Sequence, residues 1–297
     1  MSEDVISALN LQFWTLTTSA GHQVSGYHSV PSGKPVIHFI HGNGYNGLTY
    51  LPMLEALSSD YDLFISDVQG HGESDAGDGF LGWNETAQLC DEVWRQFRHH
   101  WSSVPHYGMG HSFGGIMTIF MMVRDPDLFE RAVLLDPIIF SPSMLWVMRL
   151  GTAVGLWQKN GMASRTRRRR REWPDREAAY QAFQGRGMFR GWQDEALWAY
   201  VNHALEESEN GVALKCPPEL EADIFSGFPR RLWRTLKRVP VPTHVIHGTD
   251  TYDFVLRSVS RLESLNECFS VESLSGGHCF MQQQPALAAE RIKAALS

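Results

Sequence analysis

The stretch that decides the fold runs from His106 to Val123 and reads HYGMGHSFGGIMTIFMMV. Its beginning, His106–Gly110, is short and largely apolar, which is typical of a buried strand. Phe113–Val123 is a longer apolar segment that predicts a buried helix, and a glycine-rich turn separates the two. The stretch therefore predicts a strand that passes through one sharp turn directly into a helix.

The same alternation of strand and helix extends outward from this stretch in both directions. Expected helices lie around 48–57, 85–97, 255–265 and 285–295. The other expected strands are Leu11–Thr18 and Gln23–Val30 as a hairpin, then Val36–Ile40, Tyr61–Ser66, Arg131–Leu135, Thr243–His247 and Phe269–Leu274. Apolar strands that alternate with helices predict an α/β fold, in which helices cover both faces of a parallel sheet. Functional groups in such sheets gather at the carboxyl ends of the strands.

Residues 141–238 interrupt the alternation and have a different composition. They are rich in tryptophan and arginine, and segments such as Arg176–Gln184 and Asp194–Leu205 have helical spacing. Their 17 basic and 11 acidic side chains give a net charge of +6, whereas the rest of the chain, with 9 and 22, has −13. We therefore expect a core domain of residues 1–140 and 239–297 with an inserted helical cap of residues 141–238.

Composition excludes several classes of protein. The 297 residues are 43% hydrophobic and 20% charged, as in ordinary globular proteins, and no apolar run approaches the roughly 20 residues of a membrane span. The acidic start Met1–Val5 has no features of a signal peptide, and the four scattered cysteines indicate neither a zinc site nor disulfides. We expect a cytoplasmic location and no metal or cofactor. The net charge of −7 without a recognition motif argues against nucleic-acid binding.

The turn at the centre of the opening stretch carries a chemical signal. Gly110-His111-Ser112-Phe113-Gly114 matches G-x-S-x-G, and it stands between an expected strand and an expected helix. That context is the one in which this pattern forms a nucleophile elbow, where small neighbours let the serine hydroxyl stand clear of a strained turn. Ser112 is therefore the candidate nucleophile.

A serine hydroxyl needs a neighbouring base, and the base needs a carboxylate that orients it. Among 13 histidines, His278 is the candidate base because Gly276-Gly277-His278 directly follows the last expected strand. The strand Thr243–His247 opens into a loop that contains Asp250 and Asp253. We expect Asp250 to be the orienting acid because it is closer to the strand end, and Asp253 stays open as the alternative acid.

An acyl-transfer site also needs two N–H groups that stabilise an oxyanion. The backbone N–H of Phe113 directly follows the candidate nucleophile. The second is expected from His41-Gly42-Asn43-Gly44, whose glycines allow close approach of a substrate, and Asn43 is the preferred donor.

These segments together resemble the α/β-hydrolase superfamily, in its capped serine esterase- or lipase-like branch. The matching segments also include 67–74 (DVQGHGES), Leu135-Asp136-Pro137 and His247-Gly248-Thr249-Asp250. The resemblance implies an eight-stranded, mostly parallel sheet with an antiparallel second strand, and a helical cap after the sixth strand. It also implies structural roles for Asp67 and Ser74. The chain departs from the family at Thr251, the position at which members more often carry the acid.

The expected reaction is hydrolysis of a carboxylic ester of a small or medium acyl group through an acyl-enzyme at Ser112. Alternatives are a thioesterase or a C–C bond hydrolase with the same triad, with Arg190 as a candidate anchor, or a non-catalytic ligand-binding relative. Aromatic residues of the cap form its own core or line an acyl pocket. The run of Arg165 and Arg167–Arg171 is either a solvated face paired with the acidic core or a site for an anionic substrate. Cys279 is expected to be a small buried residue, and the oligomeric state stays open.

Overall fold

The computed structural model describes residues 9–155, 157 and 160–297, so the start Met1–Val5 lies outside the described residues. Its main sheet has eight strands in the order β1-β2-β4-β3-β5-β6-β10-β11. They are β1 (Leu11–Thr17), β2 (Gln23–Ser29), β3 (Val36–Ile40), β4 (Asp62–Asp67), β5 (His106–His111), β6 (Arg131–Leu135), β10 (Thr243–Gly248) and β11 (Phe269–Leu274). β2 pairs antiparallel with β1 and β4, and the other neighbours pair in parallel. The expected mostly parallel sheet with an antiparallel second strand is confirmed.

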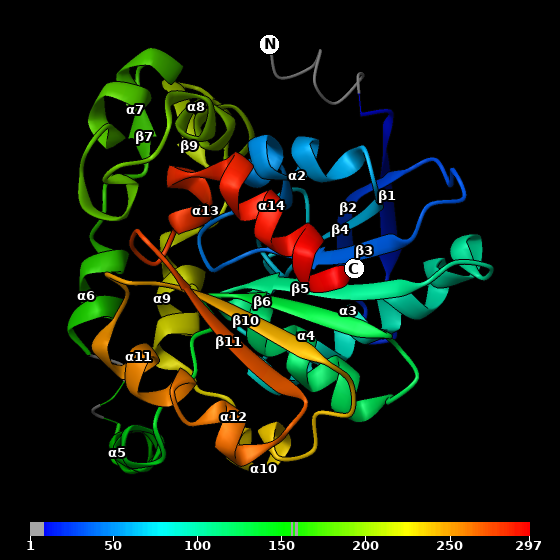
Figure 1. Cartoon of the computed structure of the whole chain (residues 1–297). Coiled ribbons are helices and arrows are strands. Elements are labelled where there is room, and N and C mark those ends of the chain that lie inside the picture. The colour runs from blue at the N-terminus through cyan, green and yellow to red at the C-terminus, as the bar shows by residue number, and fades with distance from the viewer. Residues whose placement is uncertain (1–8, 156, 158–159) are drawn as a thin grey trace.

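The central strands are buried on both faces because helices cover both. Along β3, Val36 and Ile40 belong to one hydrophobic core, while Ile37 and Phe39 belong to the other. Figure 1 shows helices on either side of the sheet. One side carries α2 (Leu51–Ser58) and α14 (Pro285–Leu296), and the other carries α3 (Trp83–Phe97) and α4 (Phe113–Arg124).

Two expected helices are divided in the structure. The segment 48–57 begins as the 3-10 turn η1 (Gly47–Tyr50), which the Asn46 side chain caps, before α2 continues it. The segment 255–265 consists of α11 (Asp253–Val259) and α12 (Leu262–Leu265). A tighter hydrogen bond from Arg261 N to Ser258 O replaces the α-helical pattern at that junction. Two further short elements are η2 (Arg98–Trp101), which follows α3, and α13 (Phe280–Gln283), which precedes α14.

The chain between β6 and β10 forms an insertion along one side of the sheet (Figure 1). Its described elements are α5 (Pro142–Ala153), α6 (Gly161–Arg167), β7 (Glu172–Trp173), α7 (Arg176–Phe183), η4 (Gly187–Phe189), α8 (Asp194–His203), β8 (Leu205–Ser208), β9 (Gly211–Leu214), α9 (Pro218–Ser226) and α10 (Leu232–Leu236). The insertion is thus largely helical. It also contains a small antiparallel sheet in the order β7-β9-β8, which the sequence did not predict.

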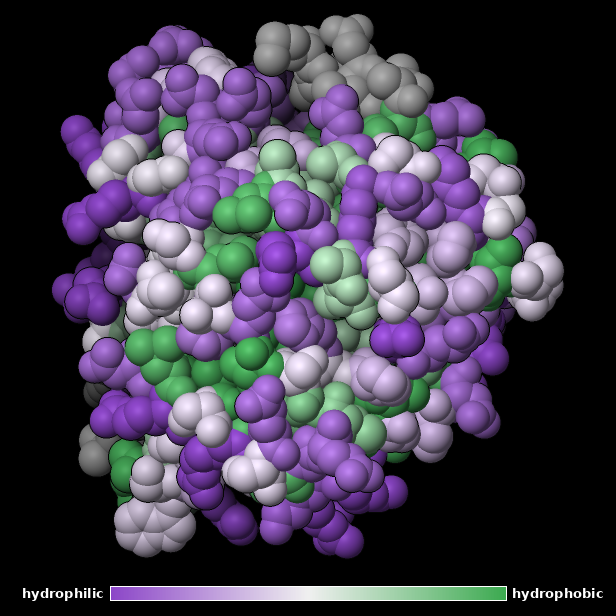
Figure 2. Space-filling model, in the orientation of Figure 1, coloured by the Kyte–Doolittle hydropathy of each residue, from purple (hydrophilic) through white to green (hydrophobic). Residues whose placement is uncertain are grey.

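The surface in the view of Figure 2 is mainly hydrophilic, and hydrophobic residues are scattered among the polar ones. Helix α5 has several exposed hydrophobic side chains close together, because Trp146, Val147 and Leu150 are each about half exposed or more. Within the described ranges, none of the helices combines the length and the apolar character that crossing a membrane requires.

Candidate active site

Ser112 lies between the end of β5 and the first turn of α4, in a strained backbone conformation. Its φ of 54° and ψ of −111° are rare for a residue other than glycine. A Cβ atom at Gly110 would lie 2.4 Å from the carbonyl oxygen of Gly114, and one at Gly114 would lie 2.1 Å from that of Ile40. The close backbone packing therefore requires glycine at both positions, as the sequence pattern predicts.

His278 lies in the loop after β11 and connects the serine to a carboxylate. Its Nε2 is 2.9 Å from Ser112 Oγ, and its Nδ1 is 2.8 Å from Asp136 Oδ1. Because a carboxylate only accepts hydrogen bonds, Nδ1–H donates to Asp136 and Nε2 is left to accept from the serine hydroxyl. This is the tautomer that a general base needs in order to take the serine proton.

Asp136, the residue directly after β6, is fully buried and tightly held. The Gly248 N–H donates to its Oδ2 over 2.7 Å, and the Thr251 hydroxyl donates to its Oδ1 over 2.6 Å. The backbone of Asp136 is left-handed, with a φ of 43°, a conformation that aspartate tolerates better than most residues. Its N–H donates to Ile246 O in β10, so the neighbouring strand fixes the carboxylate.

The structure contradicts the expected hydrogen bond between His278 and Asp250. Asp250 and Asp253 are both exposed, and the carboxylate hydrogen-bonded to His278 is Asp136. β6 and β10 are parallel neighbours, with Leu135 paired to Ile246, so a residue after β6 reaches the same point as the loop after β10. Thr251, the position at which the resemblance leads one to expect the acid, instead donates a hydrogen bond to Asp136. An aspartate directly after an apolar strand was the signal available in the sequence.

The two expected oxyanion donors lie beside the serine. Asn43 and Phe113 line the same cavity as Ser112. As the first residue of α4, Phe113 has an N–H without an acceptor in its own helix, and the positive end of the helix dipole lies there. The N–H of Asn43 has no acceptor among the described residues, and its side chain donates to Glu221 O in α9 over 3.1 Å.

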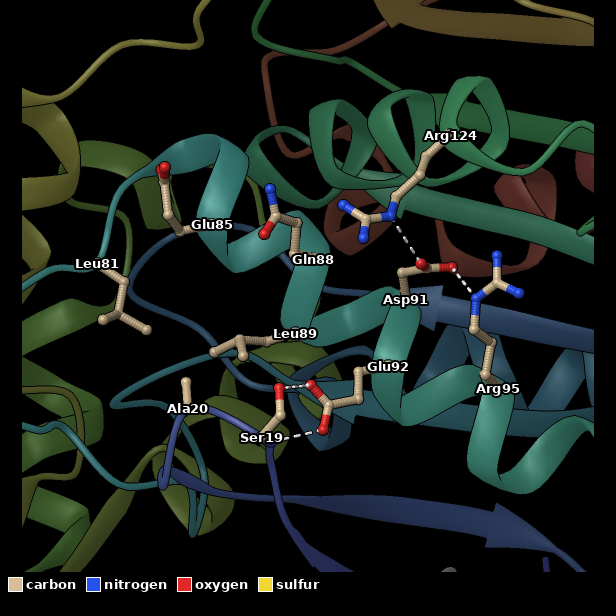
Figure 3. A pocket seen from close by; sticks show the side chains of 10 residues that line it. All are labelled: Ser19, Ala20, Leu81, Glu85, Gln88, Leu89, Asp91, Glu92, Arg95 and Arg124. Carbon is tan, nitrogen blue, oxygen red and sulfur yellow. Dashed lines mark hydrogen bonds and ion pairs between the residues drawn. The ribbon is translucent and has the colours of Figure 1, made fainter.

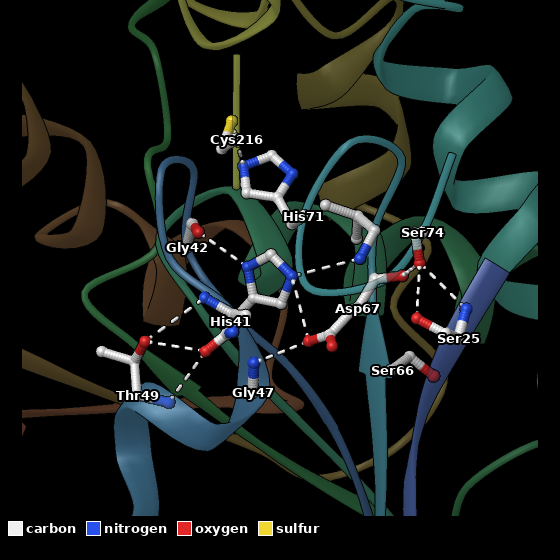
Figure 4. A network of polar contacts seen from close by, with 12 residues as sticks. Ser25, His41, Gly42, Gly47, Thr49, Ser66, Asp67, His71, Ser74 and Cys216 are labelled. Carbon is white, nitrogen blue, oxygen red and sulfur yellow. Dashed lines mark hydrogen bonds and ion pairs between the residues drawn. The ribbon is translucent and has the colours of Figure 1, made fainter. Parts of the chain in front are cut away.

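A buried polar network braces the loop that contains Asn43 (Figure 4). His71 Nε2 accepts from the Gly44 N–H over 2.9 Å, while its Nδ1 donates to Gln69 O. Burial lowers the pKa of His71 to about 4, so it stays neutral near pH 7 and keeps this acceptor. His41 Nδ1 donates to Gly42 O, and its Nε2 accepts from the Val68 N–H. The loop is therefore held from both sides by neutral histidines.

Asp67 and Ser74 belong to this network rather than to the hydrogen-bonded chain of Ser112, His278 and Asp136. The Asp67 Oδ1 accepts from the Gly47 N–H over 2.7 Å, and the Ser74 hydroxyl donates to the Asp67 carbonyl oxygen. Burial raises the pKa of Asp67 to about 7. Both residues lie in the interior and hold backbone segments, which agrees with the structural role that the resemblance implies for them.

Two adjoining cavities share His278 in their walls. The inner cavity, of about 190 Å³, contains Ser112 and is lined mainly by apolar side chains such as Ile138, Phe140 and Met148. The outer cavity, of about 1010 Å³, is more polar and includes Arg165 and Arg190. His278, the candidate base, therefore lies at the boundary between them.

A third cavity, of about 530 Å³, lies between α3 and the β1–β2 turn (Figure 3). Several of its polar groups pair with one another: Ser19 donates to Glu92, and Asp91 pairs with Arg95 and Arg124. Neither Ser112 nor His278 lines it. It is therefore separate from the candidate active site.

Several aromatic residues of the insertion are buried. Trp173, Phe183, Phe189 and Trp192 are buried in a hydrophobic core, and Trp146 is exposed. Two other side chains of the insertion, those of Trp157 and Met188, line the inner cavity. Cys279 is 3% exposed and its Sγ is 3.4 Å from Tyr45 Oη. Burial raises the pKa of this thiol to about 12, so it is not ionised near pH 7.

The arginine run pairs within the insertion rather than with the core. Ion pairs join Arg167 to Asp223, Arg169 to Glu221 and Arg171 to Glu219, and all three partners lie in α9. The expected pairing with the acidic core is thus replaced by a contact between α6, the segment after it and α9.

The chain matches the sequence profile described as "Alpha/beta hydrolase family" (Abhydrolase_6) over residues 39–291. It is 30% identical over 115 residues to "Abhydrolase domain-containing protein AKT2" of Alternaria alternata, a match that covers 38% of each chain. It is 28% identical over 192 residues to "Type I acyl-CoA thioesterase mpaH" of Penicillium roqueforti, covering 59% of this chain and 41% of that protein. These matches thus span well under half the length of the relatives.

The fold is also similar to solved structures over almost its full length. The crystal structure of E-2-(acetamidomethylene)succinate hydrolase superposes with a TM-score of 0.77 at 16% identity, covering 96% of this chain and 99% of that one. At this identity the likeness concerns the fold.

Proposed function

Because the chain belongs to the α/β-hydrolase family, we propose that it is a serine hydrolase that cleaves a carboxylic ester of a small or medium acyl group. The observation that carries the proposal is the continuous hydrogen-bonded chain from Ser112 Oγ through His278 to Asp136. An apolar cavity opens at the serine, so that an acyl group has a place to bind.

The proposed mechanism follows from the position of each group. Ser112 Oγ attacks the acyl carbon while His278 Nε2 takes its proton, and Asp136 stabilises the resulting imidazolium. The N–H groups of Asn43 and Phe113 stabilise the oxyanion. His278 then returns the proton to the leaving group. Water, activated by the same histidine, releases the acid and restores Ser112.

Residues 141–238 act in this proposal as the cap over the site. α5 contributes Met144 and Met148 to the inner cavity, and α9 contributes Ile224. The size and shape of the acyl pocket are therefore set in part by the insertion.

Thioester hydrolysis is a second candidate with the same catalytic groups. The relative from Penicillium roqueforti is described as an acyl-CoA thioesterase and matches over more than half of this chain. The chemistry differs only in the leaving atom, sulfur instead of oxygen, because attack, proton transfer and oxyanion binding are the same.

The test is hydrolysis of p-nitrophenyl acetate, butyrate, octanoate and palmitate by the wild type and by Ser112→Ala. Because the triad acts as a unit, we expect the variant to lose about 10³-fold or more in kcat. Cys279→Ala, next to the base, is the matched control and is expected to keep activity within about twofold. Turnover that survives in Ser112→Ala contradicts the proposal, and absence of turnover on these esters and on thioesters favours a non-catalytic binding protein.

A further inference from the structure

The outer cavity begins where the inner one ends, and the boundary between them is a ring of side chains. The residues that line both cavities are Met162, Met188, Phe225, Tyr252 and His278. Ser112 lies on the inner side of this ring. A substrate whose carbonyl carbon is at Ser112 therefore has one end in the inner cavity and the other beyond His278.

The two cavities differ in charge. Among the residues that line the inner cavity in the described part of the chain there is no aspartate, glutamate, lysine or arginine. The outer cavity is lined by three arginines, Arg165, Arg169 and Arg190, and by two acids, Glu221 and Asp250. An apolar acyl group fits the first environment, and a polar leaving group fits the second.

One of the three arginines is already neutralised. Arg169 Nη1 is 2.6 Å from the buried Glu221 Oε2, and its Nη2 donates to the Tyr200 hydroxyl. Arg165 and Arg190 are exposed, and within the described ranges neither has a carboxylate at ion-pair distance. Glu221 balances the charge of Arg169, and Asp250 is the one remaining carboxylate among the described residues that line the outer cavity. Arg165 and Arg190 together therefore leave an excess of positive charge there.

The backbone holds both arginines at the edge of the site. The Gln283 side chain donates from Nε2 to Arg190 O over 2.9 Å. Its Oε1 accepts from the N–H of Gly277, the residue that directly precedes His278. Arg165 is on α6, and the Asn160 side chain caps this helix and donates to Phe225 O. The backbone positions from which the two arginine side chains extend are thus held near His278 and Phe225.

We propose that the outer cavity binds an anionic leaving group, so that the substrate is an apolar acyl ester or thioester of a phosphate- or carboxylate-bearing alcohol or thiol. This rests on the proposed acyl transfer at Ser112. The Ser112 Oγ–acyl bond forms as the bond to the leaving oxygen or sulfur breaks, and the proton that His278 took from Ser112 passes to that atom. Arg165 and Arg190 bind the anionic part throughout.

The test compares three butyryl thioesters that share the acyl group and the thiol chemistry. The thiols are N-acetylcysteamine, which is neutral, glutathione, which carries carboxylates, and coenzyme A, which carries phosphates. We expect the wild type to have a kcat/KM at least about tenfold higher for an anionic thioester than for the neutral one. A preference for coenzyme A indicates phosphate as the bound group, and a preference for glutathione indicates carboxylate.

The double variant Arg165→Gln/Arg190→Gln is expected to lower the ratio of anionic to neutral kcat/KM by about tenfold. The control Arg168→Gln/Arg186→Gln removes the same charge from exposed arginines of the insertion that do not line the cavity, and it should keep the ratio. An unchanged ratio in the first variant, or an equal fall in the control, overturns the inference.

The outcomes also separate this inference from the proposed function. Turnover that depends on Ser112 but shows no preference for anionic thioesters overturns this inference and still supports the proposed hydrolase function. If no thioester or ester is turned over, calorimetric binding of butyryl-coenzyme A and of butyryl-glutathione to Ser112→Ala still tests the cavity. We expect the added Arg165→Gln/Arg190→Gln changes to weaken the binding of the preferred thioester about tenfold. If the preferred thioester binds with the same affinity with and without the two arginine changes, the inference of an anion-binding outer cavity is wrong.

Discussion

His41 and His278 each lie beside an aspartate at the carboxyl end of a sheet strand, yet the two pairs make different hydrogen bonds. Asp67 ends β4, and Asp136 directly follows β6. His278 Nδ1 is 2.8 Å from Asp136 Oδ1, a hydrogen-bond distance, whereas His41 Nε2 is 3.7 Å from Asp67 Oδ1.

The remaining partners separate the two roles further. Both nitrogens of His41 are occupied by the backbone, through Gly42 O and the Val68 N–H, and its side chain is fully buried. His278 uses one nitrogen for Asp136 and presents the other to Ser112 at the edge of two cavities. A histidine between backbone groups braces a loop, while one between a carboxylate and a hydroxyl can move a proton.

The largest expected difference between the pairs is in activity. Asp136→Asn should lower kcat for a p-nitrophenyl ester about 10³- to 10⁴-fold, because the amide no longer holds His278 in the required tautomer. Asp67→Asn should lower kcat less than about tenfold and mainly reduce the free energy of unfolding, by roughly 1–3 kcal/mol. Steady-state kinetics and urea unfolding of both variants check this, and equal losses of kcat remove the distinction between the pairs.

The second difference is in the pH dependence of stability. Burial raises the pKa of Asp67 to about 7, above the usual value of about 3.9, so the native state binds this proton more tightly than the unfolded chain does. The stabilisation is complete below pH 4 and is lost as the pH rises through 7. Relative to Asp67→Asn, the wild type should therefore lose up to about 4 kcal/mol of unfolding free energy between pH 4 and 8. If the unfolding free energies of the wild type and of Asp67→Asn change with pH in the same way, this prediction is wrong.

The bracing network should affect catalysis through the oxyanion loop. His71→Gln removes the fixed acceptor of the Gly44 N–H, and we expect kcat to fall roughly tenfold with little change in KM, because the Asn43 N–H is then less well placed. His38→Gln is the matched control, because His38 is also buried but hydrogen-bonds to Ser66 away from the loop. A larger loss of kcat in the control shows that general destabilisation is responsible.

The smallest expected effect tests whether the carboxylate can be moved. Thr251 Oγ1 is 2.6 Å from Asp136 Oδ1, so an acid at position 251 should come within reach of His278. We expect Asp136→Asn/Thr251→Asp to regain about fivefold in kcat over Asp136→Asn alone. Asp136→Asn/Asp250→Glu, in which the added length is on an exposed acid, should regain nothing. If kcat recovers only in this control, the carboxylate that can orient His278 is the one at position 250.

The fold was predictable because its signals are local. β3 and β6 were predicted to the residue from short apolar runs, and the glycines around Ser112 predicted the strained turn. The small sheet of the insertion was missed because β7 has only two residues, Glu172 and Trp173, which is too short to show alternation.

The carboxylate partner of His278 was missed because its position depends on pairing between strands that are distant in sequence. Asp136 and Thr251 are separated by 115 residues and meet only because β6 and β10 are parallel neighbours. The sequence shows three aspartates after strands of this sheet edge, Asp136, Asp250 and Asp253. The expectation compared only the two that follow Thr243–His247 and preferred Asp250 because it is closer to the end of that strand. Only the hydrogen bonds of His278 distinguish them.

The central claim is that Asp136 holds His278, and low-field proton NMR tests it most directly. A proton on His278 Nδ1 that is hydrogen-bonded to a buried carboxylate should give a resolved resonance that exchanges slowly with water. We expect this resonance in the wild type, Asp250→Asn and Asp253→Asn, and its loss in Asp136→Asn and His278→Ala. A resonance that persists in Asp136→Asn and disappears in Asp250→Asn or Asp253→Asn would contradict the account.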